Sequence, residues 1–153
     1  MGTQQLLMVI LSVIVVGTAV AVGIQMFDTS SQNLARQALV QDVIRMGVEA
    51  QAWYRTSSVM GGGGGNFNHP NFPADARQRI VQYIDSSSRT DVANFTVRNE
   101  NGSFVFDIAP NSELLNIYAT SNYATQNPIM VYGRILLSQG LEGITVDPHY
   151  TTN

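Results

Sequence analysis

Few side chains in this sequence have the types and spacing that catalysis or metal binding requires. The two histidines, His69 and His149, lie far apart in loop-like stretches, and neither has a partner at a spacing typical of metal ligands. The carboxylates to consider as an acid and base pair are Asp75 with Asp85, and Asp91 with Glu100. Surface histidines and single solvated carboxylates explain both sets more simply, so the sequence predicts neither a catalytic centre nor a metal site.

The amino-acid composition excludes several further kinds of catalytic and binding site. The chain of 153 residues has no Cys, which excludes disulfides, thiolate catalysis and cysteine-based metal sites. Its 8 basic residues are all Arg, so a Schiff-base Lys and the Lys of a phosphate loop are missing as well. The net charge of −3 favours neither nucleic acid nor an anionic membrane surface. We therefore expect no enzyme, no cofactor and no nucleic-acid partner.

Two tripeptides match the acceptor pattern for N-glycosylation, Asn94-Phe95-Thr96 and Asn101-Gly102-Ser103. Such matches occur often by chance, and their use depends on the host cell. Glycosylation at either asparagine is therefore left open by the sequence.

The elements that would position any such residue begin with a long apolar segment, Leu6 to Phe27. It carries no charge, and Asp28 is the first ionisable side chain of the chain. As a helix it would be about 33 Å long, enough to cross a bilayer core of about 30 Å. Because it is apolar on every face, it must be surrounded by lipid or by copies of the same helix.

Small residues occur in this segment at helical spacing. Gly17 and Ala21 are four residues apart, and so are Ala19 and Gly23, which lets helix backbones approach closely in apolar surroundings. Gly is also simply common in membrane helices. Gly17 and Gly23 each lower helix stability by about 1 kcal/mol relative to Ala. We expect regular hydrogen bonding to be lost somewhere between Gly17 and Gly23, with close packing of helices as the alternative role of Gly17, Ala21 and Gly23.

A helical pattern continues beyond the apolar segment. Residues 28–31 can cap or interrupt the helix, after which apolar residues recur at spacings of three and four. The residues expected in a core between helix and sheet are Leu39, Val43, Met46, Ala50 and Trp53. Polar residues are expected on most other faces: Arg36, Gln37, Gln41, Asp42, Arg45, Glu49 and Gln51. The simplest joining is one helix of roughly 50 residues.

The N-terminus lacks the basic residues of a secretory signal, and no Lys or Arg precedes Arg36. A basic leader removed before Met1 would explain this. An initiator Met before a residue as small as Gly2 is usually trimmed, so the retained Met1 also favours processing. A chain made without a leader and left untrimmed would have the same sequence.

The second half of the chain is predicted to form a loop, a short helix and a sheet. Five consecutive glycines, residues 61–65, break regular structure and suit either close backbone approach or a plain flexible turn. No Lys follows them, so they are not a phosphate loop. A short helix is expected at residues 75–85. Alternating residues predict strands at 92–98, 104–108, 114–120 and 129–137, an edge strand at 144–146, and an Asn-Gly hairpin at 99–102.

Together these elements predict an α+β fold, in which one long N-terminal helix packs on a C-terminal antiparallel sheet of four or five strands. We divide the chain into a hydrophobic helix (1–27), its amphipathic continuation (28–58), a glycine-rich loop (59–73) and a globular head (74–153).

A charge-free helix, an amphipathic continuation and a small antiparallel sheet together resemble the type IV pilin superfamily. The resemblance covers the whole chain as an architecture, but as a motif only Met1 to about Tyr54. It implies that this helix holds each subunit in the membrane until subunits are extracted into a filament with the helices in its core. The implied partners are other copies of the chain, the inner membrane before assembly, a prepilin peptidase and the pilus assembly machinery.

The sequence departs from the bacterial pattern at the fifth position, where Gln5 replaces the usual Glu and follows Gln4. In bacterial pilins that Glu pairs with the N-terminal amine of a neighbour. Gln can accept a hydrogen bond from an ammonium group, and a buried ion pair is often little better than a neutral alternative. We therefore expect a neutral docking arrangement that involves Met1, Thr3, Gln4 and Gln5. The absence of Cys also excludes the usual disulfide loop, which indicates a divergent relative.

We expect this chain to be the major structural subunit of an extracellular filament at the cell surface, with a membrane-embedded pool of precursor. The alternatives are a single-pass membrane protein that presents a small β-rich binding module, and a minor pseudopilin of a secretion system. Adhesion, motility and DNA uptake by the filament are not distinguished by the sequence.

Overall fold

The computed structural model describes residues 2–65, 76–85, 94–108, 113–123 and 128–151. Within it the chain forms two compact units, Met1–Leu34 and Ala35–Asn153. The predictions that fall on Met1, His69, Asp75, Asp91 and the start of the strand at 92–98 lie outside the described residues.

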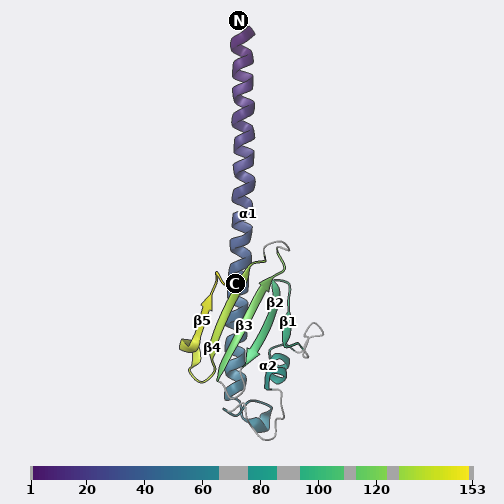
Figure 1. The fold of residues 1–153 in the computed structure, drawn as a ribbon, viewed down its shortest axis with the longest axis vertical. Helices are drawn as coiled ribbons and strands as arrows, with labels where there is room; N and C mark the ends of the chain where they lie inside the picture. The colour runs from purple at the N-terminus through teal and green to yellow at the C-terminus, as the bar shows by residue number, and fades with distance from the viewer. Residues whose placement is uncertain (1, 66–75, 86–93, 109–112, 124–127, 152–153) are drawn as a thin grey trace. The chain divides into compact units, whose positions relative to one another are not determined.

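One helix, α1 (Gly2–Arg55), makes up the described part of the first unit and continues into the second (Figure 1). The expected loss of regular hydrogen bonding between Gly17 and Gly23 is wrong for this chain, because α1 is continuous through both glycines. The physical reason is cooperativity: each residue added to an existing helix gains a hydrogen bond, and this outweighs two separate costs of about 1 kcal/mol. Residues 28–31 do not interrupt α1 either.

The second unit contains an antiparallel sheet of 5 strands in the order β1-β2-β3-β4-β5, so that every strand pairs with its neighbour in sequence. This confirms the predicted α+β fold. Phe104 of β2 pairs with Ala119 of β3, which pairs with Val131 of β4, and the three form one row of the buried face. The strands are β1 (Thr96–Arg98), β2 (Gly102–Ile108), β3 (Leu114–Ser121), β4 (Met130–Leu136) and β5 (Ile144–Asp147).

The strand β1 is shorter than the predicted strand at 92–98. Phe95 has a φ of 52°, in the left-handed region that a bulky side chain rarely adopts. The chain therefore turns immediately before Thr96, and β1 begins only after this turn. An alternating pattern of side chains cannot reveal such a backbone conformation.

The hairpin between β1 and β2 lies where the Asn-Gly signal predicts it. The backbone N–H of Asn99 donates to the carbonyl of Gly102 (2.9 Å), so Glu100 and Asn101 lie between the paired residues. Asn99 Oδ1 accepts the backbone N–H groups of Asn101 (2.9 Å) and Gly102 (3.0 Å). Because this side chain satisfies the turn, the hairpin needs no residue with positive φ.

The core of the second unit lies between the sheet and two helices, α1 and α2 (Ala76–Ile84). The five α1 residues expected in the core are 0–2% exposed, and the inward residues of every strand pack against them. The helix α1 approaches the sheet closely at β4, where a Cβ added to Gly133 would overlap the side chain of Val43. The buried residues from the helices are Leu39, Val43, Met46, Ala50, Trp53, Tyr54, Ile80 and Val81.

Gln51 is the one residue expected on a polar face of α1 that is buried, with 4% of its surface exposed. Its Nε2 donates to the carbonyl oxygens of Leu136 (3.0 Å) and Gly140 (2.6 Å). Those carbonyls lie where β4 ends and η2 (Gly140–Gly143) begins, and both hydrogen bonds are partly buried. Gln51 is therefore buried, against the expectation of an exposed polar face, because it donates to these backbone carbonyls.

The glycines at 61–65 form an ordered structure that ends α1, together with η1 (Ser58–Met60). Three of them have positive φ, and at the other two an added Cβ would overlap Thr56 or Trp53. Of the two predicted alternatives, close backbone approach is therefore found and a plain flexible turn is not. We call residues 57–65 the glycine cap. Each glycine N–H donates to a carbonyl: Gly61 to Ser58, Gly62 to Ser57, Gly63 to Trp53, Gly64 to Thr56 and Gly65 to Tyr54.

Candidate assembly site

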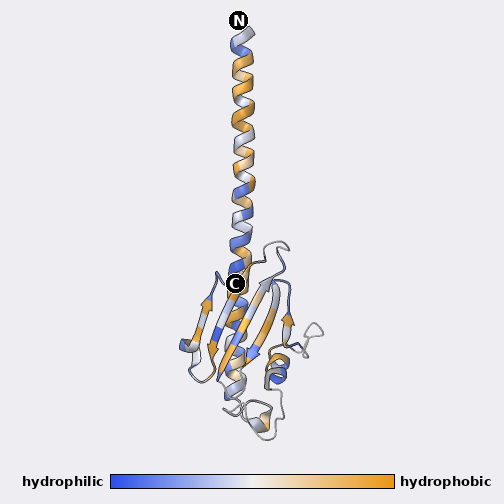
Figure 2. Ribbon diagram, in the orientation of Figure 1, coloured by the Kyte–Doolittle hydropathy of each residue, from blue (hydrophilic) through white to orange (hydrophobic). Residues whose placement is uncertain are grey.

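The apolar segment of α1 is exposed on every face. Its large apolar side chains from Leu6 to Phe27 are 52–73% exposed, and they give the hydrophobic bands along this helix in Figure 2. Removing apolar surface from water is favourable by about 25 cal/mol per Å². Covering this surface with lipid or with other apolar helices would therefore be favourable.

The hydroxyl groups of this segment are satisfied within the helix. Ser12 Oγ donates to the carbonyl of Val9 (2.8 Å), and Thr18 Oγ1 donates to the carbonyl of Val15 (2.9 Å). A buried hydroxyl without a partner would cost free energy, and these internal hydrogen bonds remove that cost. The segment can consequently enter lipid or a helix bundle without any polar group supplied from outside for Ser12 and Thr18.

Thr3, Gln4 and Gln5 lie in the first turn of α1, where the leading N–H groups of a helix have no helical acceptor. All three residues are exposed in the single chain, as are their neighbours along the segment, and no acidic residue occurs in this turn. The docking role of Met1, Thr3, Gln4 and Gln5 therefore stays a prediction.

Gly17, Ala21 and Gly23 lie on the exposed surface of the unbroken helix. A Cβ added at Gly17 or Gly23 would meet no other atom within 4 Å, so nothing in this chain requires a glycine there. Their missing side chains leave room for a second helix to approach the backbone closely. Close packing of helices at Gly17, Ala21 and Gly23 therefore stays a prediction, beside the simpler explanation that Gly is common in membrane helices.

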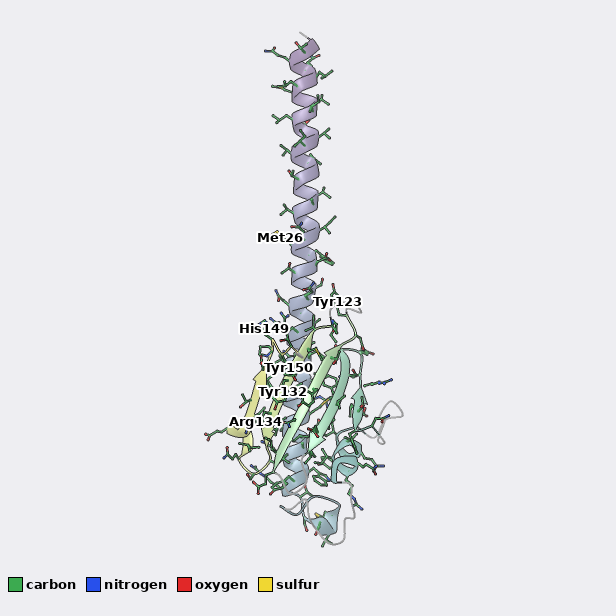
Figure 3. All side chains as sticks on the ribbon, in the orientation of Figure 1. Met26, Tyr123, Tyr132, Arg134, His149 and Tyr150 are labelled. Atoms are coloured by element: carbon green, nitrogen blue, oxygen red, sulfur yellow. The ribbon has the colours of Figure 1, made fainter. Side chains whose placement is uncertain are left out.

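Polar residues join the apolar ones toward the end of the segment. A shallow hollow of about 470 Å³ along one side of α1 is lined by Val22, Gln25, Met26, Thr29, Ser30 and Asn33, and Figure 3 shows Met26 on the helix surface. Mixed apolar and amide side chains suit the boundary between hydrocarbon and water. The change from apolar to polar side chains along this part of α1 is where the apolar segment ends.

A polar cluster ties the β1–β2 hairpin to α1 within the second unit. Asp42 Oδ2 accepts the side-chain amides of Asn99 (2.8 Å) and Asn101 (2.7 Å), and Arg45 pairs with Glu49 (2.9 Å) on the same helix. One carboxylate oxygen that holds two amides fixes the hairpin in place. The cluster has a structural role, and it occupies the Asn101 side chain.

The residues considered for catalysis are not brought together in the described part of the chain. No group of three or more His, Asp or Glu residues that could hold a metal occurs among the described residues. His149 is exposed, and its backbone N–H donates to Asp147 Oδ1 (2.9 Å) in a local turn. The two carboxylate pairs each include a residue outside the described part of the chain, Asp75 or Asp91, so their geometry stays untested.

A tyrosine cluster covers the sheet face that points away from the core, and two of its members are labelled in Figure 3. The ring centroids of Tyr118 and Tyr132 are 5.2 Å apart, and Tyr150 lies 5.9 Å and 5.3 Å from them. Burial, and then the neighbouring hydroxyls and Asp107, raise the pKa of Tyr118. Tyr132 donates to Asn116 Oδ1 (2.8 Å). The sequence predicts strands at Tyr118 and Tyr132. Tyr150 follows β5, and no local pattern in the sequence predicts that its ring contacts the other two.

Among the described residues, α1 is the one helix that is long and apolar enough to cross a membrane, so the chain is compatible with membrane insertion. A long N-terminal helix followed by an antiparallel sheet is a pilin-like architecture. Comparison of the chain with protein-family models, with curated proteins and with solved structures gives no match.

Proposed function

We propose that this chain is the major structural subunit of an extracellular pilin-like filament, in which the apolar helices of many copies bundle in the core. The observation that carries the proposal is the apolar segment, 52–73% exposed at its large side chains, joined to a unit with its own closed core. The fold of the second unit does not need that segment, so its purpose lies in contacts outside the chain.

The proposed partners follow from the same helix. Before assembly, lipid of the inner membrane would cover Leu6 to Phe27; in the filament, other copies would replace the lipid. Gly17 and Ala21 favour packing against other copies, because small residues allow helices to approach closely and lipid needs no such residues. By resemblance, a prepilin peptidase and a pilus assembly machinery would process and extract the subunits.

Replacing Val15 or Val16 with Arg tests this proposal. Each side chain is about as exposed as its neighbours in the single chain, at 57% and 62%, and would be covered in the bundle. An arginine without a partner in a dry core is very unfavourable, so we expect the variants to form no fibres. The measurement is negative-stain imaging of sheared cell-surface material, with mass spectrometry of the fibres.

Two controls make the result specific. Val16→Leu keeps the site apolar and should leave fibre yield unchanged, and Gln41→Arg adds the same charge at an exposed position of α1 in the second unit. Normal fibre yield from Val15→Arg or Val16→Arg would contradict the helix-bundle core. A wild-type chain that stays in the membrane fraction and forms no fibres would instead support the single-pass membrane protein.

A further inference from the structure

The second unit presents two adjacent apolar side chains to solvent at the end of α1. Val59 is 94% exposed and Met60 is 83% exposed, more than any other large apolar side chain among the described residues. Both belong to η1, inside the glycine cap. We call this pair the apolar knuckle.

The knuckle is held rigidly by the core beneath it. The indole Nε1 of Trp53 donates to the carbonyl of Gly61 (3.2 Å), and the hydroxyl of Tyr54 donates to the carbonyl of Gly65 (2.7 Å). Trp53 and Tyr54 are themselves buried, at 2% and 6% exposed. The backbone N–H of Met60 donates to the carbonyl of Ser57 (2.9 Å), which closes the turn that carries the knuckle.

This construction is more elaborate than the end of a helix requires. A single residue in the left-handed conformation, usually Gly, is enough to satisfy the last carbonyls of a helix. Here five glycines donate five hydrogen bonds to residues 53–58, and the ordering of so many glycines costs conformational entropy. The result is two apolar side chains fixed in water, where neither contributes to the core of this chain.

We propose that the apolar knuckle docks on an apolar surface of a second copy of this chain within the filament. This inference rests on the proposed function. Two side chains cover far less than the roughly 1,200 Å² that a stable protein–protein interface buries, so the contact persists only between molecules already held together. The helix bundle supplies that condition between copies. The residues between Arg55 and the knuckle are uncharged (Thr56, Ser57 and Ser58), which fits an apolar contact.

Thiol labelling measures whether the knuckle is covered. The chain has no Cys, so Val59→Cys introduces a single reactive thiol. We expect a neutral maleimide to react with Cys at position 59 at least tenfold more slowly in fibres than in subunits in detergent. Leu141→Cys is the matched control, because Leu141 is 72% exposed in η2 of the same unit. Equal protection at the two positions, or no protection at 59, would overturn the inference.

Cross-linking identifies what covers the knuckle. Fibres assembled from equal amounts of light and heavy isotope-labelled Val59→Cys subunits, treated with a benzophenone maleimide, should give cross-linked peptides that join light and heavy chains. Cross-links to a different protein would overturn the assignment to a second copy. If wild-type chains form no fibres, the proposed function fails together with this inference. If fibres form but Cys at position 59 reacts as fast as in subunits, only the inference fails.

Discussion

Gln51 shows how one polar side chain holds two elements of the second unit together. Its amide donates to two backbone carbonyls where β4 ends and η2 begins, 85 and 89 residues away in sequence. Removing the amide would take this donor away from both partly buried carbonyls, of which that of Leu136 also accepts the backbone N–H of Gln139 (3.4 Å). The side chain therefore contributes to stability through the acceptors that it satisfies rather than through its own burial.

We expect Gln51→Met to lower the free energy of unfolding of the second unit by about 1–3 kcal/mol, because methionine keeps the volume and loses the donor. Urea denaturation followed by circular dichroism measures the change. Gln41→Met, at an exposed site of the same helix, should change stability by no more than about 0.5 kcal/mol. Equal effects of the two substitutions would show that the hydrogen bonds of Gln51 do not matter.

Gln5 is the single residue whose substitution tests the predicted docking of subunits. If it accepts a hydrogen bond from the amine of a neighbouring Met1, Gln5→Ala should weaken assembly by about 1–3 kcal/mol per contact. Gln5→Glu should be tolerated or even favourable, because it restores an acceptor and adds an opposite charge. Fibre yield and resistance to dissociation report the effect. Assembly of Gln5→Ala at the wild-type level would exclude the docking role.

At the scale of elements, the contact of α1 with β4 is set by a glycine. A Cβ at Gly133 would overlap Val43, so we expect Gly133→Ala to lower the free energy of unfolding by about 1–3 kcal/mol through overpacking. Val43→Ala alone should also destabilise, since it opens a cavity in the core. The double variant should be more stable than the sum of the single effects predicts. Strict additivity would mean that the overlap is relieved elsewhere.

The elements themselves were largely predictable, because their signals are local. Alternation along β2, β3 and β4, the Asn-Gly turn and the spacing of Leu39, Val43 and Met46 all depend on residues a few positions apart. The roles of Gln51 and Gly133 depend on partners some 90 residues away, which no local pattern contains. The expected break between Gly17 and Gly23 is wrong for a related reason: helix propensity is a property of single residues, whereas helix stability is cooperative.

The candidate assembly site is predictable in a different sense. Its apolar residues form one continuous run that is evident in the sequence. The structure adds that none of them belongs to the core of the second unit. The apolar knuckle was not predictable, since Val59 and Met60 are ordinary apolar residues in the sequence. Their exposure follows from the backbone that the five glycines adopt, and five glycines in a row also suit a flexible turn.

At the scale of the whole molecule, every residue of the core cluster belongs to the second unit. We expect a chain truncated to residues 35–153 to fold without detergent, to unfold cooperatively in urea and to remain monomeric. Size-exclusion chromatography and circular dichroism measure this. The truncated chain should also fail to enter fibres when mixed with the full chain. Loss of cooperative unfolding after truncation would show that the first unit contributes to the fold.

The sequential order of the sheet has a consequence for how the second unit folds. Each strand pairs with the next along the chain, so the sheet can form through short loops, whereas the contact of Val43 with Gly133 closes a loop of nearly the whole unit. We expect docking of α1 to be the late, slow step, with substitutions at Gly133 changing the unfolding rate more than the folding rate. Until that step, the α1 residues that later enter the core, such as Leu39, Val43 and Trp53, are exposed to solvent. The apolar segment from Leu6 to Phe27 is exposed as well. A newly made chain would therefore be least prone to aggregate if Leu6 to Phe27 entered lipid before the C-terminal part of α1 packed on the sheet.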